Sequence, residues 1–134
     1  MTALTDNKEV IEKGRALLRY PVVASDIIYK GAIVKINAAG YLAPMAAEAG
    51  AFMAGMAYEK ADNSAGSAGD IECKVQREGV FEMVSSGLAQ ADVGSIVYAS
   101  DDQTVSTTQG TNEIAVGKIV EVISATKCLV DISV

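Results

Sequence analysis

Short runs of β-branched apolar residues, separated by turn residues, constrain the fold of this chain more than any other feature. The sequence contains 15 Val and 11 Ile but only 6 Leu, and β-branched side chains favour strands over helices. Gly, Asn, Asp and Ser interrupt the runs about every 8–12 residues. This spacing predicts an all-β protein, a small sandwich or barrel of short strands with an N-terminal arm and at most one or two short helices.

The same runs predict where the strands lie. Residues 71–77 alternate most clearly between apolar and polar, and Glu78-Gly79 indicates a bulge after which the strand continues. Pro21 marks the first run as an edge or bulged strand, and residues 37–40 (NAAG) are typical of a hairpin turn. The predicted strands cover residues 17–24, 27–29, 32–37, 52–58, 71–77, 80–84, 96–99, 104–107, 116–123 and 128–134.

Two connecting segments differ from ordinary turns. Residues 44–57 are apolar on all sides and are interrupted by Gly50 and Gly55. We expect a short helix at residues 46–49, followed by a strand, with the methionines of this segment filling the core. Residues 61–70 (ADNSAGSAGD) are typical of a flexible surface loop.

The N-terminal residues differ from the rest of the chain in pattern and in charge. The length of 134 residues predicts one domain, which we divide into an N-terminal arm, 1–19, and a β-rich body, 20–134. The arm has four basic and three acidic residues, a net charge of +1, whereas the body has seven basic and 14 acidic residues, a net charge of −7. Asp6 and Glu9 resemble a helix capping box, but Gly14 weakens a helix, so an extended arm and a short frayed helix both remain open.

Composition argues against several classes of function. The chain has no His and no Trp, and its net charge is −6, which disfavours His-dependent catalysis, nucleic acid and anionic membranes. Cys73 and Cys128 form no C-x-x-C pair and are predicted to be buried thiols, with a disulfide as the alternative. Asp101 and Asp102 indicate turn capping, with a weak Ca²⁺ site as the alternative. We therefore predict no enzymatic activity, no cofactor, no metal site, no nucleic-acid partner and no membrane partner.

Several motifs, in order and at consistent spacing, carry a resemblance that spans nearly the whole chain. The sequence resembles the capsid cement, or head decoration, proteins of tailed bacteriophages. The motifs are the opening residues 1–7 (MTALTDN), Tyr29-x-Gly31-x-Ile33-Val34-x-x-Asn37-x-x-Gly40-Tyr41, Pro44, Asp62-Asn63, Arg77-x-Gly79-Val80-Phe81, Asp92-x-Gly94, Tyr98, residues 101–106 (DDQTVS), Gly117 and Val120.

The resemblance implies a structural virion protein, made in the bacterial host cytoplasm, that binds the outer surface of a phage head and stabilises the expanded capsid shell. It further implies a homotrimer and the major capsid protein as partner. Within the arm, we expect the capsid contacts to come from Thr2, Leu4, Thr5, Asn7, Val10 and Ile11. The alternatives are a small β-barrel ligand-binding domain or enzyme of unknown substrate, or another virion component, either a head-completion or a tail-associated protein.

Overall fold

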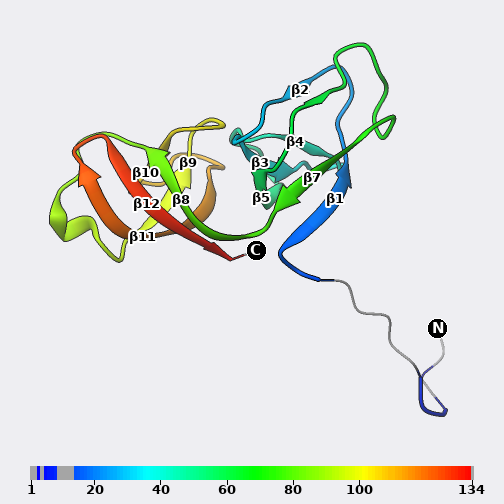
Figure 1. Ribbon diagram of the computed structural model, residues 1–134, viewed down its shortest axis with the longest axis horizontal. Coiled ribbons are helices and arrows are strands. Elements are labelled where there is room, and N and C mark those ends of the chain that lie inside the picture. Colours follow the sequence, from blue (N-terminus) through cyan, green and yellow to red (C-terminus); the bar gives the residue numbers. More distant parts are fainter. Residues whose placement is uncertain (1–2, 4, 9–13, 134) are drawn as a thin grey trace.

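The computed structural model describes residues 3, 5–8 and 14–133, and these residues form an all-β fold (Figure 1), as predicted. In the described part of the chain no helix is long and apolar enough to cross a membrane. The elements are β1 (Leu17–Pro21), β2 (Ile27–Ile28), β3 (Ile33–Ile36), β4 (Leu42–Pro44), β5 (Phe52–Ala57), β6 (Ala61–Asp62), β7 (Glu72–Gln76), β8 (Glu78–Val84), the 3-10 turn η1 (Gln90–Asp92), β9 (Ile96–Ala99), β10 (Val105–Ser106), β11 (Ile114–Ser124) and β12 (Lys127–Ser133).

Two five-stranded antiparallel sheets contain ten of these strands. The first sheet has the order β1-β7-β5-β3-β4 and the second has the order β10-β9-β11-β12-β8, while β2 and β6 pair separately. In Figure 1 the first sheet lies on the right and the second on the left. Hairpins such as β3–β4 and β11–β12 are local, whereas the pairing of β1 with β7 joins segments that are far apart in the sequence.

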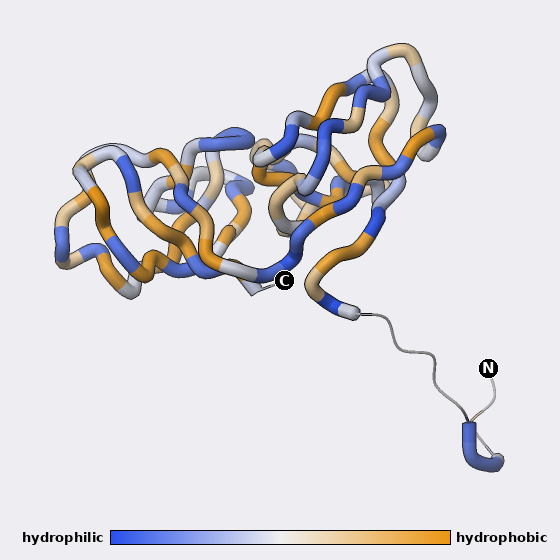
Figure 2. Tube along the Cα trace, in the orientation of Figure 1, coloured by the Kyte–Doolittle hydropathy of each residue, from blue (hydrophilic) through white to orange (hydrophobic). Residues whose placement is uncertain are grey.

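The first sheet is the central layer, which is most evident at β3. Ile33 packs in a core between the two large sheets, while Val34 and Ile36 pack in a second core that β2 and β6 cover. The second sheet buries one face, and β12 accordingly alternates between buried and more exposed residues. Figure 2 shows hydrophobic and hydrophilic residues alternating along the strands of this sheet. The predicted core methionines are buried at positions 45, 53 and 56.

The chain passes from the first sheet to the second between β7 and β8. Only Arg77 separates these strands, but β7 pairs with β1 and β5, whereas β8 pairs with β12. The prediction of one strand continuing through a bulge at Glu78-Gly79 is therefore wrong. Gly79 has a φ of 135°, and a Cβ there would lie 3.2 Å from the Phe81 ring, so glycine allows the backbone and the ring to approach closely.

The predicted helix at residues 46–49 is also wrong. Lys35, which is buried, extends its ammonium Nζ into this segment, 2.7 Å from Glu48 Oε1, and donates a hydrogen bond to the Ala46 carbonyl at 3.2 Å. The Glu48 backbone N–H donates to the Asn112 carbonyl at 3.1 Å. Backbone groups that a helix would need are thus bonded to other segments, and so short a helix gains too few internal hydrogen bonds to compete.

The segment at residues 61–70 is built around one buried amide. Ala61 and Asp62 form β6, and the Asn63 side chain donates hydrogen bonds of 2.9 Å to the carbonyls of Val23 and Ser67. Asn63 is only 3% exposed, and a buried amide of this kind needs its partners. The prediction of a flexible surface loop missed this anchor, because an Asn in a Gly/Ser-rich stretch looks like any other turn residue.

The start of β1 bears on the proposed arm. Leu17 and Leu18 lie in β1, so the alternative helix does not extend over them, and β1 begins inside the segment assigned to the arm. The strand order places β1 at one end of the first sheet, which confirms the prediction from Pro21 of an edge or bulged strand.

Candidate interaction surfaces

The arm residues expected to bind a partner divide into two groups. Thr5 and Asn7 are exposed, and the Asn7 backbone N–H donates to the Asp6 carboxylate at 2.7 Å. Thr2, Leu4, Val10 and Ile11 lie outside the described residues. The structure therefore presents Thr5 and Asn7 to solvent and brings neither against the body.

Arg15 marks the point where the arm joins the body. Its guanidinium lies 3.5 Å from the Glu78 carboxylate and 3.4 Å from the Ser133 hydroxyl, to which it donates, and its carbonyl accepts a hydrogen bond from Arg77 at 3.4 Å. The Arg15 side chain is largely exposed and that of Glu78 is about half exposed, so their ion pair contributes at most about 1 kcal/mol. These contacts fix the direction of the chain at the base of the arm more than they stabilise the fold.

One side of β1 is an open sheet edge. The Ala16 carbonyl accepts from Arg77 N–H and Val22 N–H donates to Ile71, so even-numbered residues bond to β7. The backbone groups of Leu17 and Arg19 consequently point away from β7 on the open side, whereas beyond Pro21 this side is occupied, because Val22 bridges Leu42 and Val23 N–H donates to the Leu42 carbonyl at 2.9 Å. Pro21 has no N–H to offer at this edge, which limits the number of unpaired donors without disturbing the ladder with β7.

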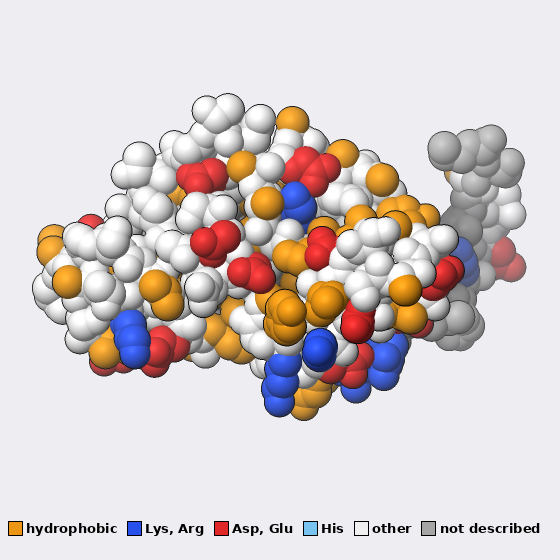
Figure 3. Space-filling view, turned by 90° about the horizontal axis from the view of Figure 1, so that it is seen from above, with side chains coloured by type: hydrophobic (Ala, Val, Ile, Leu, Met, Phe, Trp, Pro, Cys, Tyr) orange, Lys and Arg blue, Asp and Glu red, His pale blue; other side chains and the backbone are white. Residues whose placement is uncertain are grey.

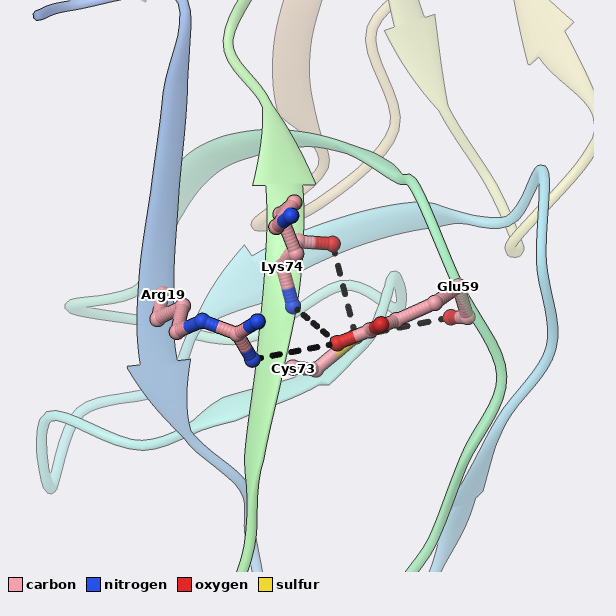
Figure 4. Close-up of polar contacts among 4 residues, drawn as sticks. All are labelled: Arg19, Glu59, Cys73 and Lys74. Atoms are coloured by element: carbon pink, nitrogen blue, oxygen red, sulfur yellow. Dashed lines mark hydrogen bonds and ion pairs between the residues drawn. The ribbon is translucent and has the colours of Figure 1, made fainter.

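Glu59 joins the exposed face of β1 and β7 (Figure 4). Its carboxylate Oε1 accepts a hydrogen bond from the Lys74 backbone N–H at 3.0 Å and lies 3.5 Å from the Arg19 guanidinium. Its carbonyl accepts from the Cys73 thiol at 3.5 Å. The cluster holds Arg19 beside the open edge. Sequence reasoning missed Glu59, because its partners come from two other segments.

The cysteines provide no nucleophile. Cys73 and Cys128 are free and fully buried, in different cores, which confirms the prediction of core thiols and excludes the disulfide alternative. Burial, with a smaller contribution from Glu59, raises the pKa of Cys73 to about 11, and burial also raises the pKa of Cys128. Both groups are therefore protonated thiols at neutral pH.

Of the two acidic residues predicted to cap a turn, Asp101 does so. The Asp101 carboxylate accepts hydrogen bonds from the backbone N–H groups of Gln103 at 2.9 Å and Thr104 at 2.7 Å. Burial alone would raise the pKa of Asp101, but these hydrogen bonds outweigh it, and the net pKa is lowered. Among the described residues no three His, Cys, Asp or Glu side chains are grouped as a metal site requires.

Charge is distributed unevenly over the surface. Figure 3 shows most of the visible Lys and Arg side chains gathered along one border of this face, beside hydrophobic side chains, while Asp and Glu are spread across it. On a chain of net charge −6, such a basic border favours contact with an acidic partner. The all-β body, its open strand edge and this border together define a binding or structural module.

Comparison with known families agrees with this class. The chain belongs to the phage cement protein family, whose model matches residues 11–133. This result confirms the resemblance noted in the sequence, and because the family is structural it confirms the prediction that the protein is not an enzyme. Membership implies binding to a capsid and a location on the virion capsid. The comparisons found no matching curated protein and no matching solved structure.

Proposed function

We propose that this protein binds the outer surface of a tailed-phage head and stabilises the shell after expansion. The family match over residues 11–133 carries the proposal. The partner is the major capsid protein, which the cement protein meets on the assembled head after synthesis in the host cytoplasm. A stabilising role requires no reactive group, only contacts that form on the expanded shell and not on its precursor.

The arm supplies part of the contact. Arg15 is tied to Glu78 and Ser133, so the chain leaves the body from a fixed point next to the open edge of β1. Exposed Thr5 and Asn7 are available to a partner. An extended segment of this kind adds affinity by pairing with a strand or lying in a groove of the capsid. The proposed contact residues are Thr2, Leu4, Thr5, Asn7, Val10 and Ile11.

We further propose that the protein acts as a homotrimer, in solution or once on the shell. Three linked copies that engage together convert weak single contacts into strong binding. Light scattering of the free protein at micromolar concentration, together with electron microscopy of decorated heads, tests this. Groups of three on the heads are expected, and single copies in both settings would contradict it.

Binding to expanded and unexpanded shells tests the function itself. We expect saturable binding to expanded shells and at least tenfold weaker binding to unexpanded ones, because expansion creates the site. Bound protein should also raise the temperature at which expanded shells disrupt. Equal affinity for both shells, or binding without a rise in that temperature, would refute a cementing role.

A further inference from the structure

A groove lies between the two large sheets. It has a volume of about 330 Å³ and is lined mainly by Lys30, Met56, Tyr58, Gln76, Phe81 and Glu82. Met56 is buried, whereas Tyr58 is 49% exposed, so the groove has an apolar floor and an accessible rim. The Phe81 ring lies so close to Gly79 that a Cβ at position 79 would be 3.2 Å from it. A pocket of this kind suits one or two apolar side chains.

The groove is bordered by an unpaired strand edge. Ser85 N–H donates to the Thr126 carbonyl, so odd-numbered residues of β8 bond to β12, and Val84 N–H correspondingly donates on the other side, to Gln103 at 3.4 Å. The backbone N–H and C=O groups of Val80 and Glu82 therefore point away from β12. In the described part of the chain no strand pairs with them.

One lysine, Lys30, lines the groove, and two further lysines lie over neighbouring tyrosine rings. Lys74 lies over the Tyr58 ring at 5.6 Å, and Lys60 lies over the Tyr29 ring at 5.5 Å. Tyr29 lines an adjoining hollow that shares Lys30 with the groove. No described carboxylate lies within ion-pair distance of these three lysines, while Glu82, the acidic residue of the groove, is 3.7 Å from Lys127.

We propose that this groove binds an extended, acidic segment of the capsid shell protein, an inference that rests on the proposed binding to capsids. The segment adds a strand to β8 through Val80 and Glu82, places an apolar side chain between Phe81 and Tyr58, and directs its carboxylates to the lysines. Strand addition with side-chain pockets is an established way to bind peptides, and complementary charge sets the register.

A second copy of this chain is a poorer occupant. Its open edge on β1 presents Leu17 and Arg19, and β10 is only two residues long, so neither offers carboxylates around an apolar residue. The β8 edge does carry Glu78 and Glu82 around Val80, but an antiparallel pair of two β8 edges centred on Val80 would place these like charges opposite each other. The shell protein, which the cement protein must contact in any case, is the occupant that the charge of the groove favours.

Site-specific cross-linking tests the occupant. The full-length variant Val80→Cys is labelled with a photo-cross-linker and bound to expanded shells. The Val80 side chain projects to the face opposite Phe81, so the label stays outside the groove, and the native thiols are fully buried and escape labelling. Val120→Cys is the matched control, because Val120 on β11 is similarly exposed, at 44% against 54%.

We expect the Val80→Cys label to capture the shell protein at least tenfold more efficiently than the Val120→Cys label. Mass spectrometry should place the link in a peptide with Asp or Glu around an apolar residue. Capture of another cement copy, capture of a shell peptide without acidic residues, or equal yields from both positions would overturn the inference.

Charge reversal separates this inference from the proposed function. The double variant Lys30→Glu/Lys74→Glu should bind expanded shells at least tenfold more weakly, whereas Lys118→Glu on β11 should bind like the unmodified protein. If the unmodified protein binds and the double variant binds equally well, the groove is not the site and only this inference fails. If the unmodified protein does not bind, the capsid-binding function fails, and this inference fails with it.

Discussion

The two large sheets differ in how many faces they bury. The first sheet lies between two cores and buries both faces of β3, including Lys35, whereas the second sheet packs one face inward and leaves the other to solvent. The open edge of β8 and the groove lie at the junction of the sheets. We therefore expect the first sheet to contribute most to stability, and the borders of the sheets to contact the partner.

A matched pair of leucines measures that difference most directly. Leu42 on β4 is fully buried, so Leu42→Ala should lower the free energy of unfolding by about 2–5 kcal/mol. Leu129 lies half-buried on the outer face of β12, and Leu129→Ala should cost about 1 kcal/mol or less. Urea denaturation of both variants provides the measurement. Equal losses in the free energy of unfolding would show that the outer faces of the two sheets contribute equally to stability.

The layer formed by β2 and β6 should contribute to the free energy of unfolding through the hydrogen bonds of Asn63. Asn63→Ala removes the donor to Val23 and Ser67 and leaves carbonyls unpaired beside the second core, which costs about 1–3 kcal/mol. Ser64→Ala next to it removes only an exposed hydrogen bond to Asp62 and should change stability by about 0.5 kcal/mol or less. Thermal unfolding of both variants provides the measurement. If both lose the same stability, the Asn63 hydrogen bonds do not stabilise this layer.

Sequence patterns predicted the elements that depend on local chemistry. The runs of Val and Ile located β9, β11 and β12, and Pro21 identified an edge strand. The change of sheet at Arg77 was not predictable, because strands that belong to one sheet or to two have the same alternation. Lys35 gave no signal of burial either, since its partner Glu48 is distant in the sequence and the pairing appears only in the folded chain.

The arm illustrates the same limit for the candidate site. Its sequence predicts a segment distinct from the body that contacts the capsid, and this stays a prediction, although Thr5 and Asn7 are exposed. The groove along β8 had no counterpart in the sequence analysis, because it combines an unpaired edge with side chains from β5, β7 and the turn before β3. Surfaces made by neighbouring strands of different sheets become visible only in three dimensions.

We expect a smaller change in stability at acid pH, which arises from the ion pair between Lys35 and Glu48. The hydrogen bond from Lys35, followed by that from Ala38 N–H, lowers the pKa of Glu48 below its usual value near 4.5. Because the folded pKa is the lower one, the contribution to stability is complete above the unfolded pKa and is lost as pH falls through the folded pKa. Glu48→Gln should therefore be less stable than the unmodified protein at pH 7, and the gap should close below about pH 4.

Stability curves from pH 2 to 7 test this, with Glu121→Gln on the exposed face of β11 as control. The control should follow the unmodified protein at every pH. A gap for Glu48→Gln that persists unchanged at pH 2 would mean that the carboxylate charge is not its origin.

Removal of the arm tests the central claim, that contacts at the border of a self-sufficient body attach this protein to the capsid. We predict that deleting residues 2–14 leaves the Tm of the free protein nearly unchanged, because the described arm residues 3 and 5–8 make no hydrogen bond or ion pair with the body and the contacts of Arg15 remain. The same deletion should weaken binding to expanded shells by tenfold or more, about 1.4 kcal/mol. A truncated protein that unfolds, or that binds shells as tightly as the full chain, would contradict this account.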